Sequence, residues 1–195
     1  MEPRTLDPDP LLQFRAWFAE AAEAVPFAEA AALATASPAA RPSVRMVLVK
    51  SADERGLAFH TNLESRKGAE LAANPHAALL FHWQPLGRQV RAEGPVEPIP
   101  EDEADAYFRS RPLGSRLAAW ASPQSRPLAD RAELERRLAE ARSRFGDDPP
   151  LPPHWGGFRL LPERWEFWLH GEHRLHHRVA YAAVAGGWRR ELLAP

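Results

Sequence analysis

The chain has 195 residues, of which 45% are hydrophobic and 26% charged, and its formal net charge is -1. This length fits one domain with a sizeable core or two small ones, and the charge leaves no global field to attract nucleic acid or an anionic membrane. The sequence contains no cysteine, which excludes disulfides, thiolate nucleophiles and cysteine-based zinc sites. Any anion-binding site must therefore be local.

The sequence also lacks the patterns of export and membrane insertion. The first residues contain no basic region followed by an apolar run, and no apolar stretch is long enough to span a bilayer. We therefore expect a cytoplasmic protein with neither a membrane nor a nucleic-acid partner.

Hydrophobic periodicity predicts many strands with helices inserted between them. A helix opens at Asp9-Pro10, others begin near Ser65 and after Pro100, and a long amphipathic helix covers residues 128–145. The predicted strands are residues 30–36, 43–50, 56–62, 77–83, 88–97, 164–169, 179–184 and 188–193, and residues 155–160 lead into the last three. Strands and helices do not alternate regularly. We therefore predict a mainly β fold with peripheral helices, an antiparallel barrel, and a single domain over residues 1–195.

Two pairs of cations in the first half of the chain could bind anions. Arg45 and Lys50 face opposite sides of one strand, so they either meet two different anions or reach solvent at the strand ends. Arg66 and Lys67 follow the helix cap Ser65, where cations oppose the helix dipole. A phosphate bound at this terminus would reverse that unfavourable sign, so we favour a phosphate site over a plain exposed turn.

A second group of polar residues lies at the end of the helix after Pro100. Tyr107 and Arg111 are four residues apart and therefore neighbours, and Ser115 follows the helix-breaking Pro112. A phenol, a guanidinium and a hydroxyl are good phosphate ligands. On these residues alone, an ordinary helix surface with a buried tyrosine is the simpler interpretation.

The densest cationic stretch is residues 170–178. If it stays extended, Arg174, His176 and Arg178 point the same way, which indicates either a bound anion or a solvated basic edge strand. The four histidines of this stretch also suggest a metal. We predict no metal site, because H-E-x-x-H is missing and Gly171 interrupts the segment.

Several segments together resemble the pyridoxamine 5'-phosphate oxidase family. They occur in the family's order: Arg45 to Lys50, Thr61-Asn62 with Ser65-Arg66-Lys67, Arg88-Gln89-Val90, Tyr107-Phe108 with Ser110-Arg111-Pro112, Gln124-Ser125, Trp155 to Arg159, and Gly171 to His176. Each piece alone is weak, but the ordered set is specific.

The resemblance implies a split β-barrel homodimer that binds FMN at the subunit interface. It implies FMN contacts from one subunit by Arg45, Thr61, Arg66, Lys67 and Gln89, and from the other by Gln124, Ser125, Trp168 and Arg178. It further implies that the substrate phosphate is held by Lys50, Tyr107, Arg111 and Ser115. Arg174 and His176 would lie over the substrate ring as the catalytic pair.

The implied reaction is oxidation of pyridoxamine or pyridoxine 5'-phosphate to pyridoxal 5'-phosphate, with O2 as the acceptor. Two alternatives remain: a related flavin oxidase with another substrate, such as the phenazine-biosynthesis relatives, and a non-catalytic protein that binds FMN or pyridoxal phosphate. The sequence departs from the family pattern at His60, where tyrosine is usual, and at His177, where aspartate is common. The basic arm that often precedes the first helix is also missing.

Overall fold

The computed structural model describes residues 1–195, apart from the side chain of Pro3. The helices are α1 (Pro10–Ala24), α2 (Arg66–Ala73), α3 (Glu101–Ser110), α4 (Leu113–Ala121) and α5 (Arg131–Phe145), with short 3-10 turns η1 (Pro3–Thr5), η2 (Gln84–Leu86) and η3 (Glu172–Arg174). The strands are β1 (Ala30–Ala36), β2 (Pro42–Asp53), β3 (Gly56–Asn62), β4 (His76–Trp83), β5 (Arg88–Pro98), β6 (Trp155–Leu160), β7 (Arg164–Leu169), β8 (His177–Val184) and β9 (Gly187–Leu193).

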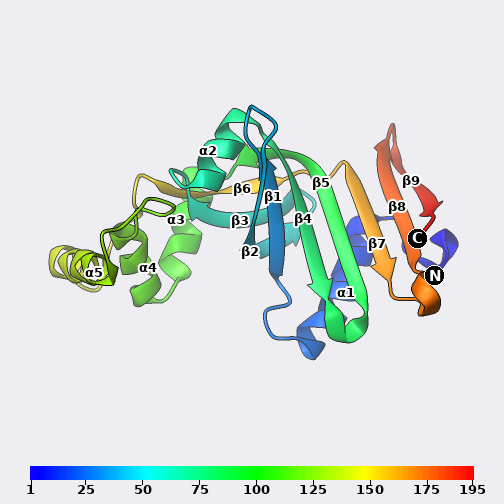
Figure 1. The fold of residues 1–195 in the computed structure, drawn as a ribbon, viewed down its shortest axis with the longest axis horizontal. Helices are drawn as coiled ribbons and strands as arrows, with labels where there is room; N and C mark the ends of the chain where they lie inside the picture. Colours follow the sequence, from blue (N-terminus) through cyan, green and yellow to red (C-terminus); the bar gives the residue numbers. More distant parts are fainter.

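Six of the strands close into an antiparallel barrel (Figure 1). The ring runs β1–β2–β3–β6–β5–β4 and returns to β1, and β5 also pairs with β7, which continues the sheet through β8 to β9. Closure removes the exposed edges that an open sheet would leave. The predicted mainly β barrel with peripheral helices is therefore confirmed.

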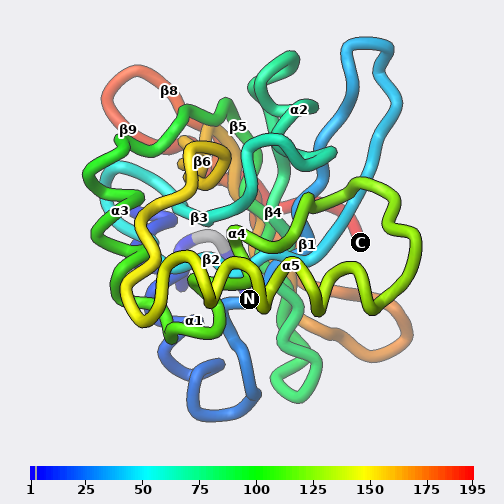
Figure 2. Tube along the Cα trace, turned by 90° about the vertical axis from the view of Figure 1, so that its left-hand side faces the viewer, coloured from blue at the N-terminus to red at the C-terminus, as the bar shows by residue number. Residues whose placement is uncertain are grey.

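The helices cover opposite sides of the barrel. α1 packs its aromatic face against the barrel strands, with the ring centroids of Phe14 and Phe81 4.9 Å apart and those of Trp17 and Phe167 5.4 Å apart. α3, α4 and α5 gather at the end away from β8 and β9, and Figure 2 views that end, with α5 in front. No helix among the described residues is long and apolar enough to cross a membrane.

Strand β2 alternates as its sequence predicts. Val47 and Val49 point into the core, while Val44, Met46 and Leu48 are 68%, 64% and 42% exposed on the outer face. The bulge near its end, between Val49 and Ser51, does not change this alternation. An apolar outer face of this kind indicates a surface that another molecule covers.

Residues 170–176 do not form the extended segment that the sequence pattern allowed. They are the loop that joins the paired strands β7 and β8, and Arg174 lies in η3 with φ 66°. The chain turns back so tightly at Gly171 that a Cβ there would lie 2.1 Å from the carbonyl oxygen of Leu175. The condition under which Arg174, His176 and Arg178 would share one strand face is therefore not met, because only Arg178 of the three lies on a strand.

Candidate active site

A cleft of about 450 Å³ lies between the outer face of β2, the end of β3 and the helices α3 and α4. The predicted site residues that line it are Lys50, Thr61, Lys67, Tyr107, Arg111, Ser115 and Gln124. The apolar part of its wall comes from Met46 and Leu48 on β2 and from Trp155 at the start of β6. The fold thus brings together residues that are up to 109 positions apart in the sequence (from Met46 to Trp155).

The N-terminus of α2 forms one cationic end of this cleft. Ser65 caps the helix as predicted, and its hydroxyl accepts from the backbone N–H of Gly68. The ammonium of Lys67 donates to Thr61 Oγ1 at 2.9 Å and to Gln124 Oε1 at 2.6 Å. Burial, and then the nearby charge of Arg45, lower the pKa of Lys67 to about 8. An anion bound here would stabilise the protonated form of Lys67.

Gln124 lies with the residues of its own chain. The resemblance implied that it completes the site of the other subunit, but its amide oxygen accepts from both Lys67 and Thr61 within this chain. We therefore group it with Thr61 and Lys67. Its neighbour Ser125 adopts φ 70° in the exposed loop that follows α4.

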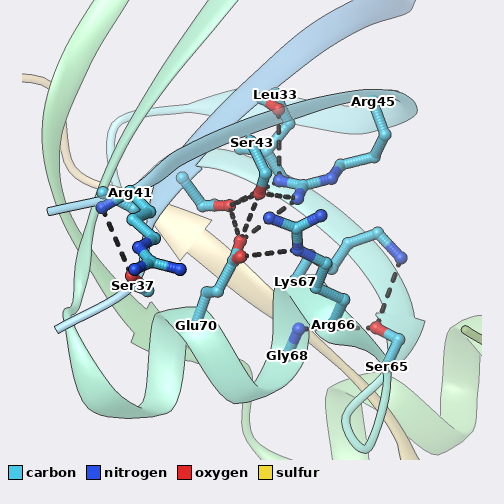
Figure 3. Close-up of polar contacts among 12 residues, drawn as sticks. Leu33, Ser37, Arg41, Ser43, Arg45, Ser65, Arg66, Lys67, Gly68 and Glu70 are labelled. Carbon is cyan, nitrogen blue, oxygen red and sulfur yellow. Dashed lines mark hydrogen bonds and ion pairs between the residues drawn. The ribbon is translucent and has the colours of Figure 1, made fainter. Parts of the chain in front are cut away.

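A buried carboxylate joins the two arginines beside this terminus (Figure 3). Glu70 on α2 is 7% exposed, and its oxygens accept from Arg66 Nε at 2.8 Å and Arg45 Nη2 at 3.2 Å. Burial raises the pKa of Glu70, but hydrogen bonds from Ser43, Thr35 and the arginines outweigh it and bring the pKa down to about 2. Glu70 is therefore ionised at all ordinary pH values. The sequence analysis missed it, although its i,i+4 spacing from Arg66 was a usable signal.

The other cationic end of the cleft is built on α3 and the rings beneath it. The guanidinium carbon of Arg111 lies 5.0 Å from the ring centroid of Trp155, and the ring of Tyr107 stacks 4.0 Å from that of His60. Arg111 Nη1 is buried and has no hydrogen-bond partner among the described residues. Burial also lowers the pKa of Arg111. A buried guanidinium nitrogen without a partner is costly, so this position suits an anionic ligand.

Two further predicted residues complete this end. Lys50 reaches the cleft from the outer face of β2 and forms an ion pair with Glu29 at 3.1 Å. Ser115 lies in the first turn of α4, a helix that the sequence analysis did not predict. Pro112 ends α3 but also begins α4, since proline is well tolerated before the first helical turn.

His60 belongs to the site although the sequence analysis marked it only as a departure from the family pattern. Both of its ring nitrogens are buried without a hydrogen-bond partner among the described residues. Burial lowers the pKa of His60 to about 4, and the positive charges of Arg111 and Arg159 act in the same direction. His60 is therefore a neutral ring in the aromatic stack at neutral pH.

The remaining predicted residues lie away from the cleft. Gln89 on β5, Trp168 on β7 and Arg178 on β8 are directly paired across neighbouring strands and so share a face. Arg178 donates from Nε to Glu166 at 2.8 Å, and the ring of His176 lies 4.6 Å from that of Trp168. This second group lies on β5, β7, β8 and the loop that joins β7 to β8, and none of its residues lines the cleft. Figure 1 shows β7 and β8 on the side of the barrel away from α3, α4 and α5. One chain thus carries two separate parts of the predicted site.

The described residues also bear on the metal question. Among them, no group of three or more histidine, cysteine, aspartate or glutamate side chains is placed to hold a metal ion.

Comparison with known proteins identifies the family. A family model described as pyridoxamine 5'-phosphate oxidase matches residues 18–145, and one described as the pyridoxine 5'-phosphate oxidase C-terminal dimerisation region matches residues 155–195. The chain belongs to the pyridoxamine 5'-phosphate oxidase family. The resemblance drawn from the ordered sequence segments is therefore confirmed, and with it an oxidase-type family.

Named relatives in this family are similar over almost the whole chain. Pyridoxine/pyridoxamine 5'-phosphate oxidase 1 of Ralstonia nicotianae is 60% identical over 192 residues, covering 97% of this chain and 91% of the relative. The pyridoxine/pyridoxamine 5'-phosphate oxidase of Anaeromyxobacter dehalogenans is 59% identical over 195 residues, covering 99% of this chain and 98% of the relative.

Solved structures share the fold. PhzG from Burkholderia lata, solved in complex with tetrahydrophenazine-1-carboxylic acid, superposes with a TM-score of 0.92 at 35% identity, covering 97% of this chain and 94% of that one. An FMN-binding protein related to pyridoxamine 5'-phosphate oxidase, from Nostoc punctiforme, has a TM-score of 0.74 at 20% identity, covering 93% and 95%. The second likeness supports the split-barrel fold alone.

Proposed function

We propose that this protein is an FMN-dependent oxidase that converts pyridoxamine or pyridoxine 5'-phosphate to pyridoxal 5'-phosphate, with O2 as the acceptor. The observation that carries the proposal is one cleft with a cationic group at each end. Lys67 and the α2 terminus suit one phosphate, and Arg111 with Lys50 suits another. A phosphorylated cofactor and a phosphorylated substrate would use both ends.

The residues that would hold FMN fit a phosphorylated, planar ligand. The crowded ammonium of Lys67 and the helix N-terminus offer positive charge, and Trp168 offers an aromatic face in the second group. The full set we assign to FMN is Arg45, Thr61, Arg66, Lys67, Gln89, Gln124, Ser125, Trp168 and Arg178. When bound, FMN would supply the two-electron acceptor that the side chains of this protein lack.

The protein's own residues would bind and orient the substrate. Lys50, Tyr107, Arg111 and Ser115 would hold its phosphate, and Arg174 would orient its ring and polarise the group at C4'. His176 would assist by hydrogen bonding. With pyridoxine phosphate, O2 is consumed and peroxide formed; with pyridoxamine phosphate, a water molecule is also consumed and ammonia released.

Two copies of the chain are needed to assemble these groups. Trp168 and Arg178 lie on β7 and β8, and Arg174 and His176 lie in the loop that joins these strands; none of the four lines the cleft of its own chain. We therefore infer a homodimer in which each chain supplies both parts of the site, as one domain over residues 1–195. The family's dimerisation region at residues 155–195 and the exposed apolar face of β2 support this inference.

A phenazine-type substrate is the second candidate, and the similarity to PhzG favours it. The ligand named in that structure is a carboxylic acid without a phosphate. The carboxylate of such a substrate could pair with Arg111 but would not need Lys50, Tyr107 and Ser115 as well. The gathering of these four polar groups in the cleft is therefore the feature that makes us prefer a phosphorylated substrate.

The test is product formation in air. FMN-loaded protein should release pyridoxal phosphate and peroxide from pyridoxamine or pyridoxine 5'-phosphate, and should act far more slowly on unphosphorylated pyridoxine. Turnover of a tetrahydrophenazine carboxylic acid but of neither phosphate ester would overturn the proposal in favour of the second candidate.

A further inference from the structure

We propose that Glu70 is a positioning residue that orients Arg66 and Arg45 for the phosphate of the cofactor. This inference rests on the proposed function, since it assigns FMN phosphate to the α2 terminus. It deepens that proposal by adding a residue that does not itself touch the ligand.

The geometry around Glu70 is that of an anchor (Figure 3). Glu70 lies one turn after Arg66 on α2, and its carboxylate accepts from Arg66 Nε at 2.8 Å and from Arg45 Nη2 at 3.2 Å. The hydroxyls of Ser43 and Thr35 donate to the same carboxylate, which is buried. Four donors from three elements thus converge on one side chain, so its position is fixed.

The two arginines are left with different capacities for a ligand. Arg66 uses Nε for Glu70, and within the described residues its Nη nitrogens have no partner, with the side chain 63% exposed. A guanidinium held at Nε presents its terminal fork outward, which is the geometry that binds phosphate oxygens in pairs. Arg45, in contrast, directs Nη1 to Leu33 O and Thr35 and Nη2 to Ser43 and Glu70. Arg45 therefore contributes mainly its charge.

This anchoring role can be distinguished from a simple charge effect by sign. A carboxylate close to a bound phosphate repels it, so removing Glu70 would tighten phosphate binding if its charge were all that mattered. If Glu70 instead holds Arg66 in place, its removal frees a long, flexible side chain, and ordering that side chain again on binding costs affinity. The geometry points to the second effect as the larger.

The test compares FMN with riboflavin, which has the same ring system but no phosphate. Dissociation constants for both flavins are measured by fluorescence quenching on the apo-protein, for the wild type, Glu70→Ala and Glu70→Gln. We expect Glu70→Ala to lower the preference for FMN over riboflavin by about tenfold, with riboflavin affinity unchanged. Glu70→Gln keeps an acceptor for Arg66, so its preference for FMN should lie between that of the wild type and that of Glu70→Ala.

A matched control removes a carboxylate of the same kind elsewhere. Glu133 on α5 forms an i,i+4 ion pair with Arg137 at 2.7 Å, and Glu133→Gln should leave both flavin affinities unchanged. A general loss of stability would lower the affinity for both flavins by the same factor. An equal loss of both affinities in both Glu70 variants would overturn the inference.

The remaining outcomes separate this inference from the proposed function. An unchanged or increased preference for FMN in both Glu70 variants would overturn the positioning role while leaving the FMN site intact. A wild-type protein that binds FMN no better than riboflavin would overturn the phosphate site at α2, and the role of Glu70 with it.

Discussion

Arg111 is the side chain on which the substrate assignment depends most. Its Nη1 is buried without a partner among the described residues, and its guanidinium lies over Trp155. The aromatic ring beneath it fixes the position of the guanidinium, and the unpaired Nη1 leaves a hydrogen-bond donor for a ligand. This combination is typical of a ligand site rather than of a structural ion pair.

Replacing Arg111 should therefore impair binding of the phosphorylated substrate. Loss of a charge-assisted hydrogen bond costs about 1.5–3 kcal/mol, so Arg111→Gln should raise KM for pyridoxine 5'-phosphate roughly 10- to 100-fold. Steady-state kinetics of pyridoxal phosphate formation measure this. Arg109→Gln, in the last turn of α3 and paired with Asp105 at 2.7 Å, is the control and should change little. An equal loss with unphosphorylated pyridoxine would contradict the assigned role.

His60 gives a prediction on pH and stability. Its pKa falls from 6.5 to about 4 on folding, chiefly through burial, so between these values the unfolded chain binds more protons. The free energy of unfolding should therefore rise as the pH rises from about 4 to 6.5. The contribution of His60 to stability should be lost as the pH falls through the same range. Glu70, whose pKa is lowered from 4.5 to about 2, makes the stability depend on pH only below about pH 4.5.

The measurement is urea unfolding of the apo-protein at several pH values between 4.5 and 6.5. His60→Phe keeps a ring in the stack with Tyr107 but cannot titrate, so the slope should flatten. A slope as steep in the variant as in the wild type would assign this pH dependence to another group.

At the scale of single elements, α2 carries the unfavourable charge pattern from which the sequence predicted a phosphate site. Two cations in the first turn oppose the helix dipole, and the structure places them beside a crowded, partly buried cleft. The same helix carries Gly68, which lies against the chain that enters it. A Cβ at this position would lie 2.0 Å from the carbonyl oxygen of Leu63.

Gly68→Ala should accordingly destabilise the protein by more than about 1 kcal/mol and weaken FMN binding, because the N-terminus of α2 must move. Gly114 on α4 is the matched control, since a Cβ there meets nothing within 4 Å. Gly114→Ala should stabilise by roughly 0.5–1 kcal/mol, as expected for an unobstructed helical glycine. Thermal unfolding and flavin fluorescence measure both; equal effects of the two changes would contradict this view of α2.

Element prediction from the sequence succeeded where the signal is local. β3 and β7 have the predicted bounds, because apolar and aromatic residues mark them. α4 was missed, since its short sequence around Gly114 reads as a turn. The loop at residues 170–176 was misjudged because pairing of β7 with β8 decides it, and alternation within the segment carries no information on that pairing.

At the scale of the whole molecule, the sequence predicted which residues line the cleft better than how they meet. The ordered family segments named both cationic ends of the cleft, yet nothing in them showed that Gln124 contacts Lys67 or that Glu70 joins the arginines. Contacts between distant segments follow from barrel closure. The separation of Trp168 and Arg178 from the cleft likewise became visible only in the fold.

The proposed homodimer predicts that the outer face of β2 is covered in solution. Met46 is 64% exposed in the single chain, and Met46→Glu would place a charge within that apolar surface. We expect the variant to be monomeric by analytical ultracentrifugation and to lose bound flavin. Leu138→Glu on α5, where Leu138 is 39% exposed, should remain dimeric. A wild-type protein that is monomeric at micromolar concentration would contradict the shared site.

The measurement that tests the central claim most directly is flavin absorbance in the absence of oxygen. FMN-loaded protein is mixed anaerobically with pyridoxine 5'-phosphate, and air is then admitted. The account predicts that the absorbance bleaches, returns with oxygen, and leaves pyridoxal 5'-phosphate. Flavin that stays oxidised with both pyridoxine and pyridoxamine 5'-phosphate would contradict it.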